Sequence, residues 1–123
     1  MADLTQIFDA LKPLLEEYRP PLLPKNETMR YFDLWSFKDL VIEGRKRKEV
    51  FFCGLIIQKD YVGFYFMPMY AEPDVKAFFP PELLKLLKGK SCFHIRKLTP
   101  ELYEQIKFVL KKGYELYQQR GWV

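Results

Sequence analysis

The chain has 123 residues, 49% of them hydrophobic and 17% aromatic, which is enough for one core in a single domain over residues 1–123. No apolar run reaches the length of a membrane span, and acidic residues stand where a secretory signal carries basic ones. We therefore expect a cytoplasmic protein with no membrane partner. The net charge of +4 does not by itself indicate nucleic acid as a partner.

The first predicted element is an amphipathic helix from Leu4 to Tyr18, in which apolar residues recur every three or four positions. Asp3 stands where it can cap the N-terminus, and Pro13 falls on the polar side, where we expect it to bend the helix. Residues 19–27 hold three prolines and predict a connecting loop, because proline donates no backbone hydrogen bond.

Short strands in an antiparallel meander are predicted next. Residues 28–37 and 40–44 have the composition of two strands, although the first does not alternate cleanly. Residues 44–49, "GRKRKE", have the polarity of a hairpin loop, and residues 50–58 and 61–70 predict a hairpin that turns at "KD".

The last third of the chain predicts a short helix from Pro80 to Gly89, a strand over residues 92–98 and a long final helix. Thr99 is placed to cap that final helix and Pro100 to open it. The expected fold class is α+β, with an antiparallel sheet of about five strands packed by an N-terminal and a long C-terminal helix.

The predicted strand at residues 61–70 is apolar on both faces. Alternation puts Val62, Phe64, Phe66 and Pro68 on one side, and Tyr61, Gly63, Tyr65, Met67 and Met69 on the other. The second set combines polar-tipped rings, thioethers and a glycine, as adaptable binding surfaces often do. Three alternatives remain open for what covers it: the helices together with "AFFPPELL", a second copy of the chain, or a bound small ligand.

The leading functional hypothesis is a non-enzymatic binding or interaction domain. Its predicted site residues are Trp35, Tyr61, Tyr65 and Met67, which would line a pocket for a small apolar or aromatic ligand, or a homodimer interface. A concave aromatic site needs only a few polar groups to orient its ligand.

The alternative hypothesis rests on the basic run Arg45, Lys46, Arg47 and Lys48. Four adjacent cations in a turn can contact phosphates, which would make the chain a weak nucleic-acid or anion binder. The same run is also what a solvated hairpin tip uses to keep a sheet edge from aggregating.

Enzymatic function has no positive support in the sequence. Cys53 and Cys92 fit reduced packing residues, and one histidine, His94, is too few for an ordinary zinc site with them. A dyad of Cys92 and His94 is the one nucleophilic arrangement to test. The chain has no phosphate loop, nucleophile elbow or zinc-protease motif, so no catalytic residue, metal ligand or cofactor is assigned.

The segments "GLIIQKDYVGFYFMPMY", "FFPPELLKLLKGKSCFHIRKL" and "YEQIKFVLKKGYELYQQRGWV" together resemble the YdhG-like family of small bacterial domains of unknown function, over residues 51–123. The resemblance implies a compact α+β fold with an antiparallel sheet packed by helices, and it brings no agreed catalytic residues. Some members of that family are linked to iron handling in the manner of frataxin. Such a role needs an acidic surface of oxygen ligands, which this basic chain lacks, so we do not carry it over.

Overall fold

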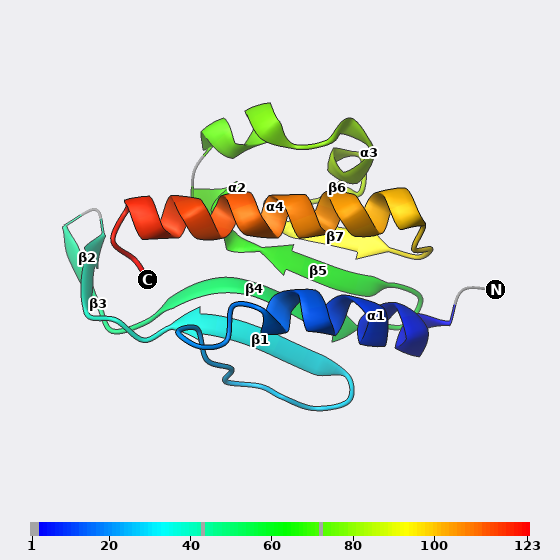
Figure 1. The fold of residues 1–123 in the computed structure, drawn as a ribbon, viewed down its shortest axis with the longest axis horizontal. Helices are drawn as coiled ribbons and strands as arrows, with labels where there is room; N and C mark the ends of the chain where they lie inside the picture. The colour runs from blue at the N-terminus through cyan, green and yellow to red at the C-terminus, as the bar shows by residue number, and fades with distance from the viewer. Residues whose placement is uncertain (1–2, 43, 72) are drawn as a thin grey trace.

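The computed structural model describes residues 3–42, 44–71 and 73–123, and its elements belong to the predicted α+β class (Figure 1). In chain order they are α1 (Leu4–Glu16), β1 (Tyr31–Ser36), β2 (Leu40–Ile42), β3 (Arg45–Arg47), β4 (Val50–Ile57), β5 (Val62–Phe66), α2 (Met67–Ala71), the 3-10 helix η1 (Pro73–Phe78), α3 (Pro81–Leu84), β6 (Leu87–Lys88), β7 (Cys92–Ile95) and α4 (Pro100–Gln119).

Five strands form one antiparallel sheet in the order β1-β4-β5-β7-β6. This confirms the predicted antiparallel sheet of about five strands packed by an N-terminal and a long C-terminal helix. Strand β4 lies between β1 and β5. It pairs with β1 although β2 and β3 separate the two strands in the chain. Strands β2 and β3 leave the sheet between β1 and β4 and pair only with each other.

Paired residues of neighbouring antiparallel strands project from the same side, and one side of this sheet carries the core. We call this side the inner face; its fully buried residues include Phe32, Leu34, Leu55, Phe64, Phe66 and Phe93. Helices α1 and α4 lie across it (Figure 1). Their amphipathic stripes and the alternation of the strands therefore meet in a single apolar layer.

The segment from α2 to α3 covers the inner face too. Phe79 stacks on Phe93 at 5.4 Å between ring centroids and contacts Phe66 at 5.7 Å. The alternative in which "AFFPPELL" covers the opposite face is therefore wrong for its central phenylalanine, Phe79. The second face must be explained without it.

The predicted helix ends are largely confirmed. The carboxylate of Asp3 accepts a hydrogen bond from the Thr5 backbone N–H at 2.9 Å, and the Thr99 hydroxyl accepts one from Leu102 at 3.1 Å. Pro13 lies exposed inside α1, so its missing N–H leaves the buried stripe intact. Helix α1 ends at Glu16, two residues before the predicted end.

The basic run is not the loop that the sequence suggested. Arg45, Lys46 and Arg47 form strand β3, paired with Ile42, Val41 and Leu40 in that order. Gly44, with φ of +77°, lies in the tight turn between the two strands, in a backbone conformation that only glycine adopts without strain. We call this excursion, from Leu40 through Lys48, the basic arm.

Two further boundaries differ from prediction. Strand β5 ends at Phe66 and Met67 begins α2, because Pro68 cannot donate a ladder hydrogen bond and suits the first turn of a helix. Strand alternation therefore does not extend to Met67 and Met69, and Met69 is buried. Helix α3 ends at Leu84, and Gly89 lies in the turn between β6 and β7.

Gly113 on α4 allows close contact between that helix and the sheet. A Cβ at this position would lie 2.5 Å from Cζ of Phe66, a ring that Phe52, Phe64 and Phe79 enclose. We predict that Gly113→Ala destabilises the protein by about 1–3 kcal/mol in urea unfolding, although alanine favours helices. The exposed variant Gln118→Ala should change stability by less than about 0.5 kcal/mol. A stabilised Gly113→Ala variant would contradict the packing described here.

Candidate functional site

The second side of the sheet, which we call the outer face, is not covered by any of the described helices. Its side chains follow the strand register, in which Ile56, Gly63 and His94 lie in one row and Gly54, Tyr65 and Cys92 in the next. The larger members are all half-buried: Tyr31, Trp35, Phe51, Ile56, Tyr61, Tyr65, Cys92 and His94. An aromatic sheet face of this kind is the candidate site.

One end of the outer face carries a parallel ring stack. Tyr61 lies on His94 with 3.7 Å between ring centroids and an angle of 12° between the planes. The guanidinium carbon of Arg96 lies 5.6 Å from the centre of the Tyr61 ring. Partial burial, followed by the charges of Arg96 and Lys88, lowers the pKa of His94, while Asp60 acts in the opposite direction.

Tyr65 joins this end of the face by lying over Gly63. A Cβ at Gly63 would lie 2.8 Å from Cε2 of Tyr65, so the missing side chain makes room for the ring. The Tyr65 hydroxyl accepts a hydrogen bond from Nε2 of Gln58 at 3.4 Å. The space left by this glycine is therefore filled by an aromatic ring of the protein itself.

The other end of the outer face carries a second group of rings. Trp35 packs against Phe51, with 5.1 Å between centroids and a tilt of 54°, and Nζ of Lys25 lies 3.9 Å from the centre of the Trp35 ring. Lys25 also pairs with the carboxylate of Glu49. A β-bulge between Leu34 and Trp35 brings this tryptophan opposite Phe51 rather than Phe52.

The predicted site residues fall into separate places. Tyr61 and Tyr65 share one end of the outer face. Trp35 lies opposite Phe51 at the other end. Phe51 precedes Gln58 by seven residues, and Gln58 is hydrogen-bonded through its backbone to Tyr61. At about 3.3 Å per residue, and allowing for the bulge, the two ends lie on the order of 20 Å apart. A single small pocket cannot include both, and Met67 lies outside the strand.

Sequence reasoning missed several partners in these two stacks: Lys25, Phe51 and Arg96. His94 was singled out for chemistry, but its ring packs on Tyr61. The alternation of β7 correctly puts His94 and Cys92 on one face, yet alternation within a strand says nothing about which residues of other strands lie beside them. That depends on register, which the long connections leave undetermined.

Asp33 is a buried carboxylate on the outer face that holds the 22–28 segment against β1. It accepts hydrogen bonds from the Lys25 backbone N–H at 2.8 Å, and from the backbone and side-chain N–H groups of Asn26 at 2.9 and 2.7 Å. Burial by itself raises the pKa of Asp33, but the hydrogen bonds from Asn26 and Lys25 outweigh it and lower the pKa below its usual value. The charged form is therefore the one the fold stabilises.

We predict that Asp33→Asn costs about 1–3 kcal/mol of unfolding free energy at pH 7. The NH2 group of the asparagine would face the N–H donors that the carboxylate now accepts from. The unfolded state has the higher pKa, so this contribution is complete above about pH 5 and is lost as pH falls through the lowered pKa of the folded state. Urea unfolding from pH 2 to 7 should show the wild type approaching the variant at low pH. A constant difference would contradict this assignment; the exposed Asp9→Asn is the control.

The surroundings of Cys92 and His94 do not favour a catalytic pair. Burial raises the pKa of the Cys92 thiol, against a smaller lowering by a hydrogen bond with Tyr65, and His94 packs on Tyr61. A nucleophilic thiol needs the opposite shift. Cys53 is fully buried and burial raises the pKa of its thiol strongly, so it fits a packing residue.

We predict slow alkylation of both thiols in the native protein. Iodoacetamide labelling of Cys92 should accelerate only above about pH 9, and Cys53 should react only after unfolding, as mass spectrometry of digested samples would show. The same protein in guanidinium chloride is the control, where both thiols should react at ordinary rates. Fast labelling of Cys92 at pH 7 would restore the dyad hypothesis.

The four cations of the basic arm, Arg45, Lys46, Arg47 and Lys48, are all exposed. Among the described residues, none of them is engaged in an ion pair or a side-chain hydrogen bond. Leu40 and Ile42 pack against the core, which holds one side of the arm to the rest of the protein, whereas Val41, on the other side, is 66% exposed. The arm leaves the sheet beside the Ser36–Val50 pair, next to Trp35 (Figure 1).

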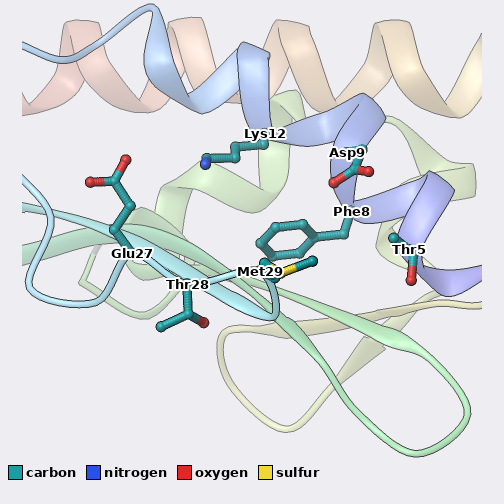
Figure 2. A pocket seen from close by; sticks show the side chains of 7 residues that line it. All are labelled: Thr5, Phe8, Asp9, Lys12, Glu27, Thr28 and Met29. Atoms are coloured by element: carbon teal, nitrogen blue, oxygen red, sulfur yellow. The ribbon is translucent and has the colours of Figure 1, made fainter.

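A cavity of about 310 Å³ lies between α1 and the residues that precede β1 (Figure 2). Its lining residues are Thr5, Phe8, Asp9, Lys12, Glu27, Thr28 and Met29. Lys12 lies 5.1 Å from the centre of the Phe32 ring, and Glu27 pairs with Arg19 at 2.8 Å. Ammonium and carboxylate groups are mixed in its wall, so its charges do not select one class of ligand.

Comparisons of the chain with models of known protein families, with curated proteins and with solved structures gave no match. The helices that the structure describes are too short or too polar to cross a bilayer. Within the described ranges, no three His, Cys, Asp or Glu side chains gather in a way that could hold a metal ion. Any assignment of function must therefore rest on the outer face and the basic arm.

Proposed function

We propose that the chain is a binding domain that takes planar aromatic groups on the outer face of its sheet. The observation that carries the proposal is the flat packing of Tyr61 on His94, beside Arg96, on a face without a helix. A ligand ring of similar shape would extend this stack at low cost, because the rings that receive it are already ordered by their neighbours.

The charge around this stack favours a ligand that also carries negative charge. Arg96 and Lys88 are exposed near His94, and Asp60 is the one opposing carboxylate that acts on the histidine among the described residues. The protein as a whole has a charge of +4, which adds a weak attraction at long range. A nucleotide combines both features, since it has a flat base and a phosphate.

The test uses adenosine monophosphate as the probe, with ribose 5-phosphate as a control of similar charge and no ring. We predict that the nucleotide moves the amide NMR signals of Tyr61, His94 and Arg96, and that ribose 5-phosphate does not. Tyr61→Ala should weaken binding about 5- to 150-fold, since a base on an aromatic side chain is worth about 1–3 kcal/mol. Phe108→Ala, an exposed ring on α4, should leave the affinity unchanged.

Tyr65→Ala is a poorer variant for this purpose, because it uncovers the space above Gly63. Equal shifts with ribose 5-phosphate, or shifts confined to the cavity below α1, would contradict the proposal.

Light scattering at the NMR concentration tests the remaining alternative, a homodimer formed through the outer face. A dimer that loses its self-association in Tyr61→Ala would mean that a second copy of the chain takes the face instead of a ligand.

A further inference from the structure

The two ring stacks lie too far apart for one small ligand to contact both. The Tyr61 stack and the Trp35 stack are at opposite ends of the outer face, on the order of 20 Å apart along the strands. The half-buried side chain of Ile56 lies on the face between them. The spacing fits a chain that carries several planar groups in succession.

The basic arm adds a feature that a small aromatic ligand would not use. Its four exposed cations stand at the end of the face that holds Trp35, where β2 and β3 leave the sheet between β1 and β4 (Figure 1). Strand alternation sends Lys46 to one side of the ribbon and Arg45 and Arg47 to the other, so positive charge surrounds the arm. Such a ribbon complements a flexible polyanion whose phosphates approach from more than one side.

We infer that the ligand of this domain is a single-stranded nucleic acid, whose bases stack on the outer face at Tyr61 and at Trp35 while its phosphates contact the basic arm. The inference rests on the proposed function and extends it from one planar group to a strand of several nucleotides. Stacking on aromatic side chains and a basic backbone track are the two ways in which single strands are held without sequence preference. A duplex has its bases stacked on one another and would leave the two ring stacks unused.

The experiment measures the binding of fluorescein-labelled decathymidylate by anisotropy over a range of salt concentrations, with decauridylate to compare DNA and RNA. The arm variant carries Arg45→Gln, Lys46→Gln, Arg47→Gln and Lys48→Gln. Its control carries four neutralised cations in the helical layer: Lys76→Gln, Lys85→Gln, Lys107→Gln and Lys111→Gln, all at exposed positions. The two variants have the same net charge and differ only in where the charge is lost.

Each cation that contacts a phosphate should contribute about 0.7 to the slope of log affinity against log salt. We predict that the arm variant lowers the magnitude of that slope by two or more, while the control variant changes it by less than one. Native circular dichroism and cooperative unfolding of both variants exclude a folding defect. Single substitution of Lys46, on the solvent side with Val41, should lower the slope by about 0.7.

Stacking is tested separately through the fluorescence of Trp35 in a Trp122→Phe background, where it is the one tryptophan left. We predict quenching by decathymidylate and none by heparin, a polyanion without bases, together with weaker oligonucleotide binding by Tyr61→Ala. An equal affinity for the duplex of the same sequence would overturn the inference.

Failure of the inference and of the proposed function can be told apart. If adenosine monophosphate still moves the signals of Tyr61 and His94, but the arm and control variants have equal salt slopes, the inference is wrong and the proposed function stands. If the oligonucleotide binds through the arm with no quenching of Trp35 and no effect of Tyr61→Ala, the inference is wrong. The proposed function is wrong as well only if adenosine monophosphate moves none of the signals of Tyr61, His94 and Arg96.

Discussion

The close approach of α4 to the sheet at Gly113 is the constraint on which the rest of the structure depends. The absence of a side chain there lets the Phe66 ring fill the space between helix and strand. About one turn further along the same helix, the Tyr117 hydroxyl donates to the Phe51 carbonyl at 2.6 Å. Burial raises the pKa of Tyr117, in keeping with a ring enclosed by Phe52 and Trp122. All of the helical layer consequently collects on the inner face.

None of the described helices packs on the outer face, and its aromatic residues pack on one another instead. Tyr65 covers Gly63, Tyr61 lies on His94, and Trp35 lies on Phe51. Asp33 adds a polar contact that anchors the 22–28 segment alongside β1. Each ring is ordered by a neighbour yet stays partly exposed, which is the state in which an aromatic surface binds planar groups with little loss of side-chain entropy.

The distribution of charge separates the two ends of this face in their roles. Near Tyr61, positive charge comes from Arg96 and Lys88, and it is strong enough to help lower the pKa of His94. Near Trp35, Lys25 is already paired with Glu49, and the adjacent basic arm supplies cations instead. A polymer with alternating planar and anionic groups matches this arrangement better than a single small ligand does, because the two kinds of contact are spread over the length of the sheet.

How far prediction reached is best seen in particular elements. The caps Asp3 and Thr99, the hairpin of β4 and β5 and the buried stripe of α4 follow from local pattern, since a helix repeat or a strand alternation is written in consecutive residues. Strand β3 was missed because charged residues rarely form strands, and pairing with Leu40–Ile42 overrides that preference. Met67 was misplaced because the apolar pattern continues to Tyr70, whereas the strand ends at Phe66 and Pro68 lies in the first turn of α2.

The sequence by itself determined the class of fold, the faces of its strands and the residue types that any site would use. Only the tertiary structure decided that Tyr61 meets His94 and Arg96 while Trp35 meets Phe51 and Lys25, and that these groups lie apart. The physical reason is that alternation specifies the side to which a residue points, whereas its neighbours on that side come from strands whose order and register are set by packing of the whole core.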